Sequence, residues 1–93
     1  AVVLNNIFFD FGKYDLLLAN IHRNIILMDL RTYSRSLRAG GVLLLSGFYE
    51  SDIPDIRTEA VKCGLEFIRQ RVENGWACLH FRRDRSLRTE EIL

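Results

Sequence analysis

Short apolar runs alternate with an amphipathic segment in the first half of the chain. Residues 15–19 form a largely apolar run that is bounded by polar residues and is too short for a helix, which indicates a strand buried on both faces. From residue 24 apolar side chains recur mostly at intervals of three and four, which predicts a helix. We expect the glycine pair at 40–41 to end it, because glycine accepts the left-handed cap conformation. Residues 42–45 then predict a second buried strand, closed by the Ser-Gly pair at 46–47.

The next polar cluster predicts the start of a second helix. Ser51 and Asp52 can accept hydrogen bonds from the first amides of a helix, and Pro54 suits its first turn. We therefore expect a helix over residues 52–63, with Gly64 as its cap.

The remaining pattern predicts a hairpin. Extended segments over residues 65–72 and 76–82 flank Asn74 and Gly75, and Asn-Gly between two such runs favours a tight β-turn. Alternating strands and helices imply parallel strands, and the hairpin adds one antiparallel strand. The predicted fold class is α/β, with a mostly parallel sheet that ends in an antiparallel hairpin.

Composition changes this picture little. The 93 residues are 48% hydrophobic and 27% charged, with a net charge of +1, which favours one globular domain and predicts no strong attraction to nucleic acid or membranes. Cys63 and Cys78 lack metal-site or redox spacing, so we expect a reduced, cytoplasmic protein without a metal. In the tail, four arginines form a mixed run with nearby acidic residues, which favours a solvated terminus over a phosphate-binding patch. These arginines are Arg82, Arg83, Arg85 and Arg88.

Candidate chemistry follows the two buried strands, because ligands of open α/β sheets bind beyond the carboxyl ends of the strands. Asn20 can orient an amine nucleophile through its side-chain oxygen, or it can simply cap the next turn. Gly47 permits a close backbone approach to a ligand, or turns the chain. His22 is a candidate base, although a surface histidine near a helix start more often has no catalytic role.

Aromatic residues lie beside these positions. Phe48 and Tyr49 follow the second strand, where they can line an acceptor pocket or join the core. Trp76 follows the hairpin turn, where we expect packing rather than stacking on a ligand. The sequence contains no Ser-His-Asp set and no phosphate-binding loop that we can identify.

Residues 15–21 resemble the fourth-strand motif of class I S-adenosylmethionine-dependent methyltransferases. Their continuation through residues 22–27 resembles the PrmA family, which methylates large-subunit ribosomal protein eleven. The resemblance covers about residues 13–82 and leaves residues 1–12 and 83–93 unassigned. Its further matches lie at residues 40–41, 45–49, 52–54, 64–65 and 74–76.

The resemblance implies the C-terminal half of a Rossmann-like methyltransferase domain. The implied reaction is methyl transfer from S-adenosylmethionine to lysine or amino-terminal amines of a ribosomal protein. Asn20 would lie beside the transferred methyl group as the catalytic residue, in contact with both cofactor and acceptor. Ile21, Ser46, Gly47 and Phe48 would bind the substrate.

The chain also departs from the family pattern. It has no glycine-rich cofactor loop after a first strand, and no acidic residue that would hold the ribose. We therefore interpret residues 1–93 as a partial domain that is inactive alone. The alternative is a non-enzymatic interaction module derived from a methyltransferase; a dehydrogenase fragment is disfavoured by the terminal hairpin.

The missing half would leave the strand at residues 15–19 with a bare edge, which promotes pairing or aggregation. We expect this edge to be covered by residues 2–9, folding back through a turn at 10–13, or by a second copy of the chain. We favour the fold-back, and a homodimer through the same edge stays open.

Overall fold

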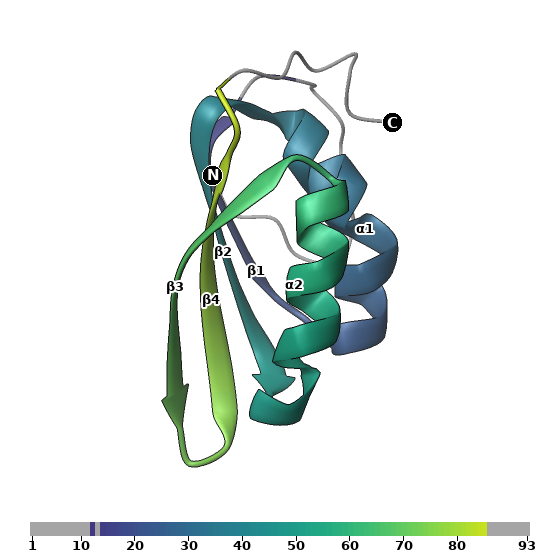
Figure 1. Ribbon diagram of the computed structural model, residues 1–93, viewed down its shortest axis with the longest axis vertical. Coiled ribbons are helices and arrows are strands. Elements are labelled where there is room, and N and C mark those ends of the chain that lie inside the picture. Colours follow the sequence, from purple (N-terminus) through teal and green to yellow (C-terminus); the bar gives the residue numbers. More distant parts are fainter. Residues whose placement is uncertain (1–11, 13, 86–93) are drawn as a thin grey trace.

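Strands and helices alternate along the chain until the final hairpin, in the order predicted from the sequence. In the computed structural model, residue 12 and residues 14–85 are described, and Figure 1 shows their arrangement. The elements are β1 (Tyr14–Asn20), α1 (Arg23–Ser36), β2 (Leu37–Tyr49), the short 3-10 helix η1 (Glu50–Asp52), α2 (Ile53–Lys62), β3 (Leu65–Glu73) and β4 (Trp76–Arg83).

The four strands form one sheet in the order β1-β2-β4-β3. β1 and β2 are parallel, whereas β4 runs antiparallel to both of its neighbours, β2 and β3. Both helices cover the same face of the sheet (Figure 1). The predicted α/β class with a terminal antiparallel hairpin is therefore confirmed.

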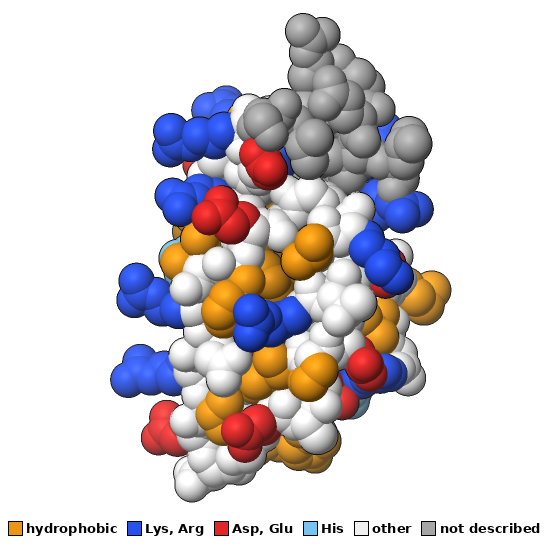
Figure 2. Space-filling view, in the orientation of Figure 1, with side chains coloured by type: hydrophobic (Ala, Val, Ile, Leu, Met, Phe, Trp, Pro, Cys, Tyr) orange, Lys and Arg blue, Asp and Glu red, His pale blue; other side chains and the backbone are white. Residues whose placement is uncertain are grey.

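Side chains that alternate along the strands build the core against the two helices. Because successive strand residues point to opposite faces, one face of the sheet packs on α1 and α2, and the other carries partly exposed side chains such as Leu18 and Leu44. Figure 2 shows Lys and Arg side chains along the edge where β3 lies, and apolar side chains toward the helices. The buried core includes Leu17, Ala19, Ile26, Leu30, Leu43, Leu45, Ile56, Ala60, Leu79 and Phe81.

The end of α1 differs from the prediction. The helix stops at Ser36, and the glycine pair at 40–41 lies inside β2. Leu37 is fully buried and extended, and it pairs with Tyr14. Its side chain gains more by entering the core than by continuing the helix. Gly40, with φ of +79°, instead lies in an irregular stretch of β2, where the pairing with β1 shifts register.

Two predictions around residue 50, a strand end at Gly47 and a helix cap at Asp52, differ from the structure. Gly47 does not close the second strand, because β2 continues through a bulge to Tyr49. Asp52 does not cap α2 with its side chain; its carboxylate instead accepts the backbone N–H of Tyr49 at 3.0 Å. Pro54 lies in the first turn of α2, as predicted.

The two remaining turn predictions are confirmed. Gly64 follows α2 with φ of +78°, and its N–H bonds the carbonyl of Val61. Asn74 and Gly75 join β3 to β4 with φ of 52° and 82°. Two positive φ values in succession define the type I′ turn that matches the twist of a hairpin.

One tail arginine is not solvated as the sequence pattern suggested. Arg83 is the last residue of β4 and is only 2% exposed, and its guanidinium donates a hydrogen bond to the carbonyl of Leu37. Arg82 is half-buried, Arg85 is exposed, and Arg88 lies outside the described residues. Among the described helices, none is long and apolar enough to cross a membrane.

Candidate functional site

The carboxyl ends of the two parallel strands lie side by side. Asn20, the last residue of β1, pairs in register with Ser46 of β2. The next residue of the chain continues this alignment, since the N–H of Ile21 donates to the carbonyl of Ser46 at 3.0 Å. The polar side chains expected to meet at this end of the sheet are therefore brought together.

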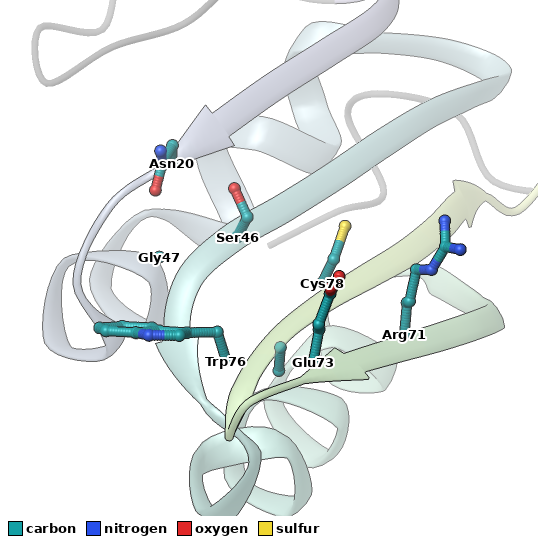
Figure 3. A pocket seen from close by; sticks show the side chains of 8 residues that line it. Asn20, Ser46, Gly47, Arg71, Glu73, Trp76 and Cys78 are labelled. Atoms are coloured by element: carbon teal, nitrogen blue, oxygen red, sulfur yellow. The ribbon is translucent and has the colours of Figure 1, made fainter.

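An open pocket of about 590 Å³ lies over these strand ends on the face of the sheet away from the helices, within the range of small-ligand sites. Figure 3 shows Asn20, Ser46 and Cys78 pointing to the same side of the sheet, with the Trp76 ring reaching toward Gly47. The lining residues are Asn20, Ser46, Gly47, Arg71, Glu73, Trp76, Ala77 and Cys78.

A stacked aromatic pair borders the pocket. The rings of Tyr49 and Trp76 lie 4.4 Å apart at 23°, and both side chains remain about half exposed. Trp76 thus packs on Tyr49, as the packing prediction required, but it does so at the surface rather than in the core. Aromatic surface held in this way is available to a ligand at low entropic cost.

The other candidates occupy different environments. Ile21 and Phe48 are 8% and 1% exposed, and both belong to the core beneath the strand ends rather than to the pocket lining. His22 is exposed just before α1, where its carbonyl accepts the N–H of Ile26. Its side chain is not among those that line the pocket.

The charged lining comes from β3. Arg71 and Glu73 are two positions apart on the strand, so their side chains share one face, and both point to the pocket side of the sheet (Figure 3). Glu73 places a carboxylate at the rim, where it can attract a cationic amine. Among the described residues, His, Cys, Asp and Glu do not gather into a cluster that could hold a metal ion.

The two cysteines differ in environment. Cys78 lines the pocket, whereas Cys63 is buried in the core at the end of α2. Burial raises the pKa of the Cys63 thiol because a thiolate is poorly solvated there. Only Cys78 is placed to meet a ligand.

Both the sequence and the fold of this chain are similar to those of known proteins. The profile described as ribosomal protein L11 methyltransferase (PrmA) matches residues 1–84. This chain belongs to the PrmA family. A ribosomal protein L11 methyltransferase of Bacteroides thetaiotaomicron is 46% identical over 70 residues, which cover 75% of the chain. One from Porphyromonas gingivalis is 47% identical over 75 residues, or 81% of the chain.

Solved structures agree with this membership of the PrmA family. The ribosomal protein L11 methylase of Lactobacillus delbrueckii subsp. bulgaricus superposes with a TM-score of 0.73 at 25% identity, covering 78% of this chain and 38% of that one. A Thermus thermophilus 16S rRNA methyltransferase, in complex with AdoMet and guanosine, shares the fold with a TM-score of 0.60 at 19% identity, over 82% of this chain and 22% of its own. The chain spans about a quarter of the length of its curated PrmA relatives.

Sequence reasoning found the β1 and β2 side of the pocket and missed the hairpin side. The missed lining residues are Arg71, Glu73, Trp76, Ala77 and Cys78. The Asn-Gly turn held a usable signal, because it reverses the chain and makes β4 begin at the end of the sheet where its partner strand finishes. The pairing of β4 with β2, which places Trp76 opposite Tyr49, was the information that the sequence lacked.

Proposed function

We propose that this chain is the C-terminal part of an S-adenosylmethionine-dependent protein methyltransferase. Its substrate is a large-subunit ribosomal protein, methylated on lysine or amino-terminal amines. The observation that carries the proposal is the position of Asn20 in the pocket beside Ser46, in a chain of the PrmA family. Membership of this family supports an enzyme over a non-enzymatic interaction module.

The lining residues suit the handling of an amine. Glu73 attracts the ammonium form of the acceptor to the rim through charge. The ammonium loses one proton to solvent water. The Asn20 side-chain oxygen then accepts an N–H of the resulting neutral amine and directs the amine lone pair into the pocket. Trp76 and Ala77 add apolar surface to the lining, against which a bound acceptor sheds part of its hydration. Alignment and desolvation are the main demands of this chemistry, so no strong base at the strand ends is required.

The cofactor fits these residues in part. S-adenosylmethionine, when bound, supplies a methyl group activated on a sulfonium. Asn20 is exposed at the strand end and suits contact with the methyl-bearing end of such a group. In the part of the chain that the structure describes, no strand is followed by a glycine-rich turn that would hold the rest of it, and the acidic residue of the lining, Glu73, lies on the hairpin side. We therefore assign this chain the acceptor side of the site.

Replacement of Asn20 by alanine in the full-length protein tests the proposal. The variant loses the oxygen that orients the acceptor amine, so we expect methyl transfer to a ribosomal protein substrate to fall by about 100-fold. Cofactor affinity, measured by titration calorimetry with S-adenosylmethionine, is expected to change by less than about threefold, because most cofactor contacts lie elsewhere.

His22→Ala is the matched control, since His22 is exposed two residues away and does not line the pocket. We expect this variant to keep both the methyl-transfer rate and the cofactor affinity. Equal losses of transfer and affinity in Asn20→Ala would contradict the assignment of Asn20 to the acceptor side.

A further inference from the structure

Gly47 occupies an unusual backbone position at the end of β2. The pairing of β2 with β4 shifts register between Ser46 and Phe48, so Gly47 is the extra residue of a bulge. Its φ of +94° lies in a backbone region that residues with a side chain rarely adopt. Bulges of this kind redirect the strand and often lie beside functional sites.

The bulge brings the Gly47 backbone against the end of β1. A Cβ atom on residue 47 would lie 2.4 Å from the side-chain oxygen of Asn20 and 2.9 Å from the backbone nitrogen of Ile21. Both distances are shorter than van der Waals contact allows. The space that a side chain would fill is therefore occupied by the Asn20 carboxamide.

The Asn20 side-chain oxygen lies against the Gly47 backbone. Asn20 is exposed, and within the described part of the chain no hydrogen bond holds its carboxamide. An exposed asparagine without such a bond normally exchanges between rotamers. Because Gly47 has no side chain, the Asn20 carboxamide can pack against its Cα atom, and this contact favours one rotamer at the pocket wall.

We propose that Gly47 is a positioning residue for the transfer reaction. Its missing side chain creates the recess in which the Asn20 carboxamide is held at the acceptor end of the pocket. The expected effect on catalysis rests on the proposed function. The contact between Gly47 and Asn20 does not depend on that function. Gly47 thus acts through Asn20 rather than by touching the acceptor.

Gly47→Ala in the full-length protein tests the inference. The added methyl group drives the carboxamide out of the recess, so we expect the turnover number to fall by at least about tenfold with an unchanged KM for S-adenosylmethionine. Gly75→Ala is the matched control. Gly75 also has a positive φ, of +82°, but a Cβ there meets nothing within 4 Å, so backbone strain without the Asn20 contact should leave turnover within about twofold of the wild type.

A double-mutant cycle separates positioning from general damage. In Asn20→Ala the carboxamide is absent, so adding Gly47→Ala to this variant should cost much less turnover than Gly47→Ala costs in the wild type, because only the contact with the Ile21 backbone remains. Losses that multiply in the double variant would overturn the inference, as would a Gly47→Ala enzyme with wild-type turnover.

A second variant covers the case in which Gly47→Ala does not fold. Asn20→Gln keeps the carboxamide and the Gly47 backbone but adds one methylene group, so the amide no longer fits the recess. We expect a turnover as low as that of Asn20→Ala, and near wild-type turnover would overturn the inference.

A spectroscopic readout distinguishes failure of the inference from failure of the proposed function. With 15N-labelled asparagine, the side-chain NH2 resonances of Asn20 should move in Gly47→Ala and stay in place in Gly75→Ala. If the wild type transfers no methyl group but these resonances move, the proposed function is wrong and the contact stands. Resonances that stay in place in Gly47→Ala would reject the contact, whatever the activity.

Discussion

On the open face of the sheet, charged side chains shift the pKa of a neighbouring histidine. His80 of β4 pairs in register with Arg69 of β3, and Arg82 lies two residues further along the same strand. Partial burial lowers the pKa of His80 below its usual 6.5, and the two arginines lower it further by repelling its protonated form. The hairpin therefore presents cationic groups around a histidine that remains neutral near pH 7.

This arrangement predicts a pH dependence of stability with a definite sign. The unfolded chain binds the His80 proton more readily than the folded one, so the free energy of unfolding falls as pH decreases below 6.5 and levels off beneath the folded pKa. Arg69→Gln should raise the His80 pKa in an NMR titration and weaken this fall, while the distant Arg38→Gln should not. An unchanged His80 pKa in Arg69→Gln would contradict repulsion by Arg69 as a cause of the lowered pKa.

At the scale of the elements, a single buried arginine joins the last strand to the start of β2. The Arg83 guanidinium bonds the carbonyl of Leu37, the residue at which the chain leaves α1 and becomes extended. A second link joins the helices, since Arg23 at the start of α1 lies 3.5 Å from Asp52 and also pairs with Asp55 of α2. Both ion pairs of Arg23 are partly exposed, so we expect them to contribute little to the free energy of unfolding.

Arg83→Met tests the buried link. Methionine keeps much of the apolar stem but leaves the Leu37 carbonyl without its charged donor, so we expect a loss of about 2 kcal/mol in the free energy of unfolding by urea. Arg85→Met, at an exposed position, is the control and should change stability by less than about 0.5 kcal/mol. Similar stability for both variants would show that the guanidinium contributes nothing to the junction.

At the scale of the whole molecule, the outer edge of β1 is the feature that bears on association between chains. Among the described strands β1 has β2 as its one neighbour, and a strand edge that is left bare promotes association with another chain. The expected cover, residues 2–9, lies outside the described residues. Coverage by that segment or by a second copy therefore stays a prediction.

Sedimentation of the 93-residue chain with and without residues 1–9 addresses this prediction. If the segment folds back, the intact chain should sediment as a monomer, and the shortened chain should self-associate at concentrations at least about tenfold lower, because the exposed edge recruits another strand. Equal self-association of both forms would reject the fold-back. A stable monomer of the intact chain at high concentration would remove the homodimer.

The amino-acid pattern predicted the order of the elements and the part of the site that lies on β1 and β2. Local features sufficed for these: the apolar run of β1, the spacing of α1 and the Asn-Gly turn each act over a few neighbouring residues. Asn20 and Ser46 were found because parallel strands align their carboxyl ends, which is a general rule of the fold class. The resemblance to the PrmA family rested on the same segments.

The end of α1, the close contact of Gly47 with Asn20 and the hairpin side of the pocket depend on contacts made in the folded chain. Leu37 leaves the helix because its side chain enters the core and Arg83, far along the chain, bonds its carbonyl. Gly47 is required by Asn20 of another strand, and Trp76 joins the site by pairing with Tyr49. These contacts join segments distant in sequence, so no local pattern encodes them.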